Sequence, residues 1–160
     1  MGCEIERKFL IDPTRWRRPV RGVRMIQGYL TRQDGLTVRV RIAGRQGFLT
    51  LKGATNNFSR SEYEYRIPAG DAEALLREFA EGALVRKTRY RCRHREHWWE
   101  VDVFEEANAG LIMAEIELSS EDECFALPAW VTREVSFDSR YRNGNLALHP
   151  YCEWQNTEKN

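Results

Sequence analysis

Residues 4–9 read EIERKF, and this short stretch decides the fold class. Successive side chains on a β-strand point to opposite faces, so Glu4, Glu6 and Lys8 would share one face while the isoleucine and phenylalanine would share the other. An α-helix would scatter them, because positions two apart are not neighbours on a helix. The stretch therefore predicts a β-strand with one charged face and one apolar face.

The same two-residue alternation of charge returns in later segments of the chain. The charged members of these sets are Arg39, Arg41, Lys52, Arg60, Glu62, Glu64, Lys87, Arg89, Glu100, Asp102, Glu115 and Glu117. One such strand would be ordinary, since an exposed sheet face is often polar. The charges are sorted by sign into pairs, however, whereas a surface that serves solubility intersperses them. The repeated pattern predicts strands that surround a charged interior.

Short connections join the candidate strands, which run over residues 3–11, 23–32, 36–44, 47–54, 58–67, 84–95, 97–105, 111–119 and 130–137. Asp34-Gly35 is a good hairpin signal, and residues 44–47 and 108–110 supply further turns. Such short links require antiparallel pairing. We therefore predict a mainly β (α+β) fold in which an antiparallel sheet closes into a barrel, because about eight strands enclose room for one small ligand.

Three short helices are predicted to interrupt the strands and to pack outside them. The first begins at Asp12, which precedes Pro13 at a first helical position. The second follows Asp71 and carries an apolar stripe at helical spacing. The third begins at Ser120, which forms a capping-box pattern with Glu123.

Length and composition limit the function. A chain of 160 residues supports one core, so we expect a single domain over residues 1–150 and a polar, mobile tail over residues 151–160. The net charge of +1 argues against a protein devoted to nucleic acid or anionic membranes. The four cysteines show no C-x-x-C spacing, and no apolar run is long enough to span a bilayer. We therefore expect reduced thiols and a cytoplasmic location.

The paired charges indicate two kinds of ligand. Carboxylates held close together repel each other unless a cation lies between them, and hard oxygen ligands favour Mg²⁺, Mn²⁺ or Ca²⁺. Paired arginines and lysines favour an anion rich in oxygen, because a guanidinium donates two parallel hydrogen bonds to a phosphate. A metal-bound polyphosphate inside the barrel would meet both needs.

A series of ordered motifs resembles that of the CYTH superfamily, the triphosphate tunnel metalloenzymes. EIERK at 4–8 is similar to the ExExK signature of that family. It is followed in the family's order by VRVR at 38–41, LK at 51–52, RSEYE at 60–64, KTRY at 87–90, WEVDVF at 99–104, AEIEL at 114–118, and REVS and DSRYRN within 133–143. Two departures are Arg133, where lysine is more common, and Glu105-Glu106, where glycine is common.

The resemblance implies an eight-stranded antiparallel closed β-barrel that forms a tunnel, with one or two bound Mg²⁺ or Mn²⁺ ions. It implies hydrolysis of inorganic triphosphate to pyrophosphate and phosphate by water. Class IV adenylyl cyclases and nucleoside or thiamine triphosphatases are the alternative, and a noncatalytic polyphosphate-binding module is the second alternative. The resemblance also suggests a homodimer with a small triphosphate substrate and no nucleic-acid or membrane partner.

The candidate site residues are carried over from these motifs. Those assigned to the triphosphate oxygens are Lys8, Arg39, Arg41, Lys52, Arg60, Lys87, Arg89 and Arg133. Those assigned to metal ions are Glu4, Glu6, Glu115 and Glu117, with Glu64 and Asp102 as further ligands. Those assigned to the chemical step are Lys8 and three carboxylates, of which one would orient the attacking water: Glu62, Glu64 and Asp102.

Three further features have less specific interpretations. His94 and His97 are expected to be surface or packing residues, since two histidines beside a turn lack the further ligands that zinc needs. Trp98, Trp99 and Trp130 are expected to pack outside the barrel. The basic cluster either forms a solvated face or steers polyanions toward the tunnel, and its members are Arg15, Arg17, Arg18, Arg21 and Arg24.

Overall fold

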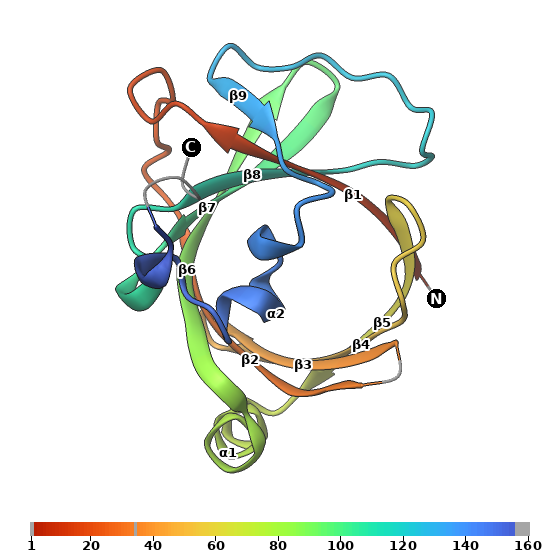
Figure 1. Cartoon of the computed structure of the whole chain (residues 1–160), viewed down its shortest axis with the longest axis vertical. Helices are drawn as coiled ribbons and strands as arrows, with labels where there is room; N and C mark the ends of the chain where they lie inside the picture. The colour runs from red at the N-terminus through yellow and green to blue at the C-terminus, as the bar shows by residue number, and fades with distance from the viewer. Residues whose placement is uncertain (1, 34, 156–160) are drawn as a thin grey trace.

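The structure, a computed structural model, describes residues 2–33 and 35–155. Its strands are β1 (Gly2–Ile11), β2 (Val23–Gln33), β3 (Leu36–Ala43), β4 (Gln46–Lys52), β5 (Ser59–Ile67), β6 (Glu81–His94), β7 (His97–Phe104), β8 (Ile112–Glu117) and β9 (Val131–Glu134). They pair in the order β5-β4-β3-β2-β6-β7-β8-β1-β9, and β5 also pairs with β1. The first eight strands therefore form a closed antiparallel barrel (Figure 1), which confirms the predicted fold class.

The ninth candidate strand is real but lies outside the closed ring. β9 pairs only with the second half of β1, whose first half pairs with β5. The predicted hairpin at Asp34-Gly35 joins β2 to β3, although Asp34 itself lies outside the described residues. The alternation of charge thus located the barrel strands, and the short extra strand explains why nine runs were found for an eight-stranded barrel.

One of the three predicted helices forms. Helix α1 (Ala69–Phe79) lies outside the barrel and buries Ala72 and Leu76 against the outer face of β2–β4. The helix predicted at Asp12 is wrong, since residues 13–15 form only a turn. The Asp12 carboxylate accepts hydrogen bonds from the Thr14 backbone N–H and hydroxyl, as a helix cap would, but no helix follows.

The helix predicted from Ser120 is also wrong, since residues 118–130 form turns and irregular backbone. The Glu123 carboxylate, expected to cap that helix, instead accepts from the Ser119 backbone N–H and lies 2.7 Å from His97 Nε2. A side chain engaged on the rim of the sheet cannot close a capping box. The long loop therefore follows the barrel wall without helical structure.

The C-terminal segment enters the barrel, which corrects the expectation that all helices pack outside. Beyond β9 the chain forms η2 (Ser139–Tyr141), α2 (Asn143–Leu146) and η3 (Tyr151–Glu153), and Figure 1 shows α2 within the ring of strands. These turns contribute to an inner apolar cluster with Tyr29, Val85, Phe104, Leu111, Met113, Val135, Tyr141, Leu146, Ala147 and Trp154. One part of the lumen is therefore packed with apolar side chains.

Residues 151–154 differ from the expected mobile tail. Trp154 is buried and packs edge-to-face against Tyr141, with ring centroids 5.0 Å apart. Its indole N–H donates to the His149 backbone oxygen at 3.1 Å. The segment is mostly polar in sequence, and its two aromatic residues, Tyr151 and Trp154, make the contacts with the inner cluster. The rest of the predicted tail, residues 156–160, lies outside the described residues.

Apolar side chains also cover the outside of the barrel. Phe9, Trp99 and Ile116 form an outer cluster that is covered by Phe125 and Trp130, as expected for Trp99 and Trp130. The short helix η1 (Glu106–Asn108) joins β7 to β8. All four cysteines are free thiols. In the described part of the chain, no helix has both the length and the apolar character needed to cross a membrane.

Leu146→Ala tests whether the C-terminal segment is part of the barrel core. Leu146 has no exposed surface, so its truncation should lower the free energy of unfolding by about 2–5 kcal/mol in urea denaturation. Leu148→Ala is the matched control, because Leu148 is 59% exposed and should change stability by less than about 0.5 kcal/mol. A loss for Leu146→Ala as small as that expected for Leu148→Ala would show that the segment does not stabilise the barrel.

Candidate functional site

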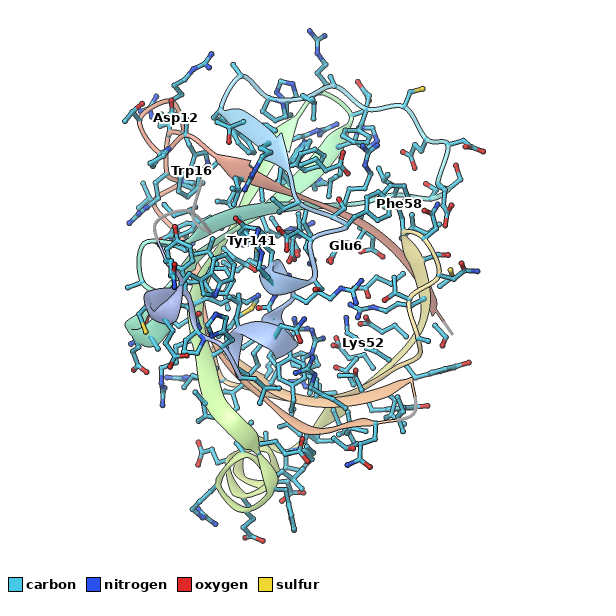
Figure 2. The ribbon with its side chains drawn as sticks, viewed as in Figure 1. Glu6, Asp12, Trp16, Lys52, Phe58 and Tyr141 are labelled. Atoms are coloured by element: carbon cyan, nitrogen blue, oxygen red, sulfur yellow. The ribbon has the colours of Figure 1, made fainter. Side chains whose placement is uncertain are left out.

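A cavity of about 950 Å³ lies inside the barrel and is lined by charged side chains. The predicted site residues that line it are Glu4, Glu6, Lys8, Arg39, Arg41, Lys52, Arg60, Glu62, Glu64, Lys87, Arg89, Glu115 and Glu117. Figure 2 shows Glu6 and Lys52 within the ring of strands, whereas Asp12 and Trp16 lie outside it. The alternation of charge therefore identified an interior surface.

Two predicted site residues do not line the cavity. Asp102 is completely buried behind the cations of β6. Arg133, which pairs with Leu10 across β1 and β9, is exposed and donates to the Tyr141 hydroxyl at 3.1 Å. The positions of these two side chains do not fit the direct contacts with metal, water or phosphate that the motifs suggested.

Strands β1 and β8 bring carboxylates together on one wall. In the register of these strands Glu6 lies opposite Glu117, and Lys8 lies opposite Glu115. Lys8 Nζ donates to Glu115 Oε1 at 2.6 Å and also to Glu6, while Arg89 Nη2 donates to Glu115 Oε2 at 2.7 Å. Glu115 thus has two cationic partners, whereas no ion pair with a described residue involves Glu117.

The pKa values of these carboxyl groups differ in direction. Burial, together with the nearby Glu115, raises the pKa of Glu6. Burial and the charges of Glu4 and Glu6 raise the pKa of Glu117. Burial alone would raise the pKa of Glu115 as well, but Lys8 and Arg89 hold it well below its usual value. Glu6 and Glu117 therefore lie where additional positive charge would be favourable.

A second group of ion pairs joins β1, β4 and β5. Lys52 Nζ lies 3.0 Å from a Glu4 oxygen and 2.5 Å from a Glu62 oxygen, and Arg60 Nε lies 2.7 Å from Glu4. Burial opposes ionisation of Glu62, but Lys52 lowers its pKa overall. Glu62 is therefore an ionised carboxylate at the cavity wall, paired with Lys52.

The arginines of β3 retain unused donors. Arg39 and Arg41 donate to Glu64 Oε2 at 3.2 and 3.0 Å, and the Thr50 hydroxyl donates to the same oxygen at 2.9 Å. The Nε atoms of both arginines are buried without a hydrogen-bond partner among the described residues. Because a buried donor without an acceptor is costly, these N–H groups favour an incoming anion.

Asp102 holds two cations in position. It accepts from Lys87 Nζ at 2.5 Å and from Arg89 Nε and Nη2 at 2.7 and 2.8 Å. Burial would raise the pKa of Asp102, but Arg89 and Lys87 lower it. Burial lowers the pKa of Lys87 to about 8, against the attraction of Asp102. The Lys87 ammonium is therefore close to losing its proton in the mildly alkaline range.

The cavity also contains residues that the sequence analysis missed. Asn143 in α2 accepts from Lys87 Nζ at 3.0 Å and from Gln27 Nε2 at 3.2 Å, and its neighbour Arg142 also lines the cavity. Both lie in the DSRYRN motif. Because this segment is not a strand, the alternation of side chains could not predict which of them face the cavity. Arg32 was missed because the pairing of β2 with β3 shifts register after Tyr29. Beyond this shift the alternation is offset by one residue, so Arg32 lies on the same inner face as Tyr29.

The rim of the cavity carries Trp98 and His97, of which Trp98 was expected to pack outside the barrel. Trp98 is on the inward face of β7, is 49% exposed, and has the Arg91 guanidinium 4.9 Å from its ring centroid. His97 packs against Phe125, which agrees with a packing role.

The carboxylates of the β1–β8 wall are hard oxygen donors, which suit a divalent cation. Their side chains, however, do not form a coordination site in this structure. Among the described residues, no three His, Cys, Asp or Glu side chains converge as a metal site. Glu4, Glu6 and Glu115 point at lysines and arginines instead. The raised pKa values of Glu6 and Glu117 nevertheless indicate carboxyl groups for which burial and neighbouring carboxylates outweigh the nearby positive charge. The oxygen donors at this wall therefore have the chemistry that a divalent cation requires.

Comparison with protein families gives a match that covers the whole barrel and most of the chain. The CYTH domain family matches residues 2–147. This chain belongs to the CYTH family. The match spans the eight barrel strands, β9 and the α2 segment, so the cavity lies entirely within the family domain. Triphosphatases of this family depend in general on divalent metal ions.

The CYTH chain has similar curated relatives and solved structures. It is 42% identical to an inorganic triphosphatase of Acetivibrio thermocellus over 94% of this chain and 97% of the relative. It is 40% identical to an inorganic triphosphatase of Nitrosomonas europaea over 91% of this chain and 97% of the relative. A crystal structure of an inorganic triphosphatase matches with 38% identity and a TM-score of 0.66, over 90% of this chain and 97% of the other.

The pKa of Lys87 predicts the alkaline limb of activity. Below about pH 8 the Lys87 ammonium is charged and attracts an anionic substrate, and above that pH it is neutral. We expect kcat/KM for tripolyphosphate to fall as pH rises through this range. In Lys87→Arg the side chain stays charged, so the fall should move to higher pH. If kcat/KM of the variant falls over the same pH range as in the wild type, a group other than Lys87 causes the fall.

Proposed function

We propose that this protein hydrolyses inorganic triphosphate to pyrophosphate and phosphate inside the barrel cavity. The observation that carries this proposal is the closed cavity wall, on which buried cations with unused donors face carboxylates with raised pKa values. An anion with many oxygens and a divalent cation would satisfy both at once. The inorganic triphosphatases that resemble this chain over most of their length support the same activity.

The cations of the cavity would bind and orient the triphosphate. Lys8, Lys52, Lys87 and four arginines surround the cavity from β1 and β3–β6, and the arginines are Arg39, Arg41, Arg60 and Arg89. Each is held by a carboxylate, which for Lys87 is Asp102 behind the cavity wall, so it is positioned before substrate arrives. Fixed positive groups stabilise the charge that develops on the phosphoryl oxygens during transfer. Arg142 would add a further cation from the C-terminal segment.

We propose Mg²⁺ or Mn²⁺, one or two ions, as the cofactor. Glu4, Glu6, Glu115 and Glu117 would hold it, because they share the wall where positive charge is lacking. A bound divalent cation neutralises phosphate charge and lowers the pKa of water. Lys8, now hydrogen-bonded to Glu6 and Glu115, would turn toward phosphate oxygens as these carboxylates take other partners.

The chain's own carboxylates would orient the attacking water. Glu62 and Glu64 line the cavity beside the arginines of β3 and would accept a hydrogen bond from water. The lowered pKa of Glu62 keeps it ionised. Asp102 would act through Lys87 and Arg89, which it holds in place from behind. Water would attack the terminal phosphorus, and pyrophosphate would leave.

Nucleoside and thiamine triphosphates are the second class of substrate, and Trp98 favours them. Its half-exposed ring at the cavity rim offers a flat surface on which an organic base could stack. Adenylyl cyclase activity would yield cyclic AMP from ATP. A purely binding module is disfavoured, because so many cavity carboxylates would weaken simple anion binding. Phosphate release from tripolyphosphate, ATP and thiamine triphosphate separates these possibilities.

We also propose a cytoplasmic location, which the four free cysteines support. The homodimer that the family resemblance suggested stays a prediction, and light scattering of the purified protein tests it.

Glu6→Gln and Glu117→Gln should separate catalysis from stability. Each change removes a negative charge that would hold metal, so phosphate release with Mg²⁺ or Mn²⁺ should fall about 100-fold or more. The melting temperature without metal should stay the same or rise, since both groups have raised pKa values in the fold. Phosphate assays and thermal melts measure the two effects.

The matched control is Glu73→Gln in α1, outside the cavity, which should leave turnover unchanged. Near-normal turnover of both wall variants would remove Glu6 and Glu117 from the metal site. Absence of tripolyphosphate hydrolysis by the wild-type protein with either metal would contradict the proposed activity itself.

A further inference from the structure

The connection between β1 and β2 forms a basic surface separate from the cavity. We use the name arginine loop for residues 12–24, which are this connection and the first two residues of β2. The arginine loop carries five exposed arginines: Arg15, Arg17, Arg18, Arg21 and Arg24. None of the loop residues lines the cavity. The loop runs outside the barrel, where Figure 2 shows Asp12 and Trp16. It is therefore a second cationic surface with no part in the cavity wall.

The arginine loop is anchored to the barrel. Trp16 is buried and packs edge-to-face on Tyr90 at 5.6 Å, and its indole N–H donates to Cys92 Sγ at 3.4 Å. The Asp12 backbone N–H donates to the Trp130 oxygen at 2.8 Å. The buried tryptophan fixes the middle of the RWRR sequence, so its neighbouring arginines are held at the surface. Binding to this loop would cost less ordering entropy than binding to a free segment.

The positive charge of the loop is only partly compensated, since its five arginines stand against one carboxylate of the loop itself, Asp12, which attracts Arg15. Across residues 2–33 and 35–155, no carboxylate forms an ion pair with Arg15, Arg17 or Arg21. Arg24 pairs with Glu105 at 3.2 Å, but its side chain is 76% exposed. Arg18 lies over the rings of Trp16 and Tyr90 rather than against an acid. In a chain of net charge +1, this clustering leaves a local excess that favours a polyanion.

We propose that the arginine loop is a docking site for linear inorganic polyphosphate longer than triphosphate. The arginines are spread over ten residues, so a repeating anion contacts more of them than a single phosphate can. Guanidinium groups match the paired oxygens of phosphate. The inference rests on the proposed function, since a docked chain would keep a polymer of the same phosphoanhydride chemistry near the enzyme and raise its local concentration.

The test uses the full chain with Arg15, Arg17 and Arg21 changed together to Gln. Binding of fluorescently labelled long-chain polyphosphate is measured by anisotropy, with a metal chelator to prevent hydrolysis and excess tripolyphosphate to occupy the cavity. The control changes three other exposed arginines to Gln, namely Arg45, Arg66 and Arg77, none of which lines the cavity. Both variants lose the same charge, so a difference between them reports on the loop itself.

We expect the loop variant to bind polyphosphate about 10-fold or more weakly than the control at physiological salt. The slope of log Kd against log salt should fall by about two to three, one for each lost phosphate contact. Equal affinity of the two variants would overturn the proposal, as would complete displacement of polyphosphate by tripolyphosphate. Single-stranded RNA, poly-glutamate or anionic vesicles that bind the wild type as tightly as polyphosphate would overturn the assignment of the ligand.

Hydrolysis of tripolyphosphate by the same proteins distinguishes this proposal from the proposed function. The loop variant should keep the wild-type kcat/KM for tripolyphosphate, since its changes lie outside the cavity. Loss of polyphosphate binding with unchanged tripolyphosphate turnover supports the docking site. Failure of the wild type to hydrolyse tripolyphosphate, with loop-dependent binding intact, would contradict the catalytic proposal alone.

Discussion

The structure depends on bringing opposite charges together on the inner face of a closed barrel. An ionised side chain taken out of water is costly unless a partner of opposite sign and hydrogen bonds compensate it. Here the compensation runs from strand to strand: Lys8 to Glu115, Glu115 to Arg89, and Arg89 to Asp102. The closed sheet allows this arrangement, because strands far apart in sequence face the same lumen. The outer apolar clusters and the inner C-terminal cluster supply the burial that stabilises the barrel.

The compensation is incomplete in places where a ligand would complete it. Arg39 and Arg41 keep buried N–H groups without acceptors, and Glu6 and Glu117 have raised pKa values. A site built in this way holds its groups ready at some cost in stability, as preorganised catalytic sites generally do. In the proposed reaction, phosphate oxygens would replace the carboxylate partners of the cations, and divalent cations would take over those carboxylates.

Much of the barrel and its charged interior could be predicted from the sequence, because strand alternation is a local signal with a fixed period. The errors arose where that period did not apply. A register shift in β2 brought Arg32 to the inner face, and the α2 segment entered the lumen without strand structure. Alternation gives the face of a residue but not its depth, so Asp102 was assigned to the cavity although it lies behind Lys87 and Arg89. The failed helix at Ser120 reflects a tertiary contact of Glu123 with His97 that no local pattern contains.

The central claim is that a divalent cation and triphosphate bind together. The cation compensates the carboxylates of the cavity wall, and the triphosphate compensates its lysines and arginines. Calorimetric titration of Mg²⁺ or Mn²⁺, with and without a non-hydrolysable imidotriphosphate, tests it most directly. The metal affinity corrected for binding by free imidotriphosphate should rise about 10-fold or more when the protein is loaded with the analogue, and linkage requires the same factor for the analogue when metal is present. Equal metal affinity with and without the analogue would contradict the account, because the two charges would then be accommodated independently.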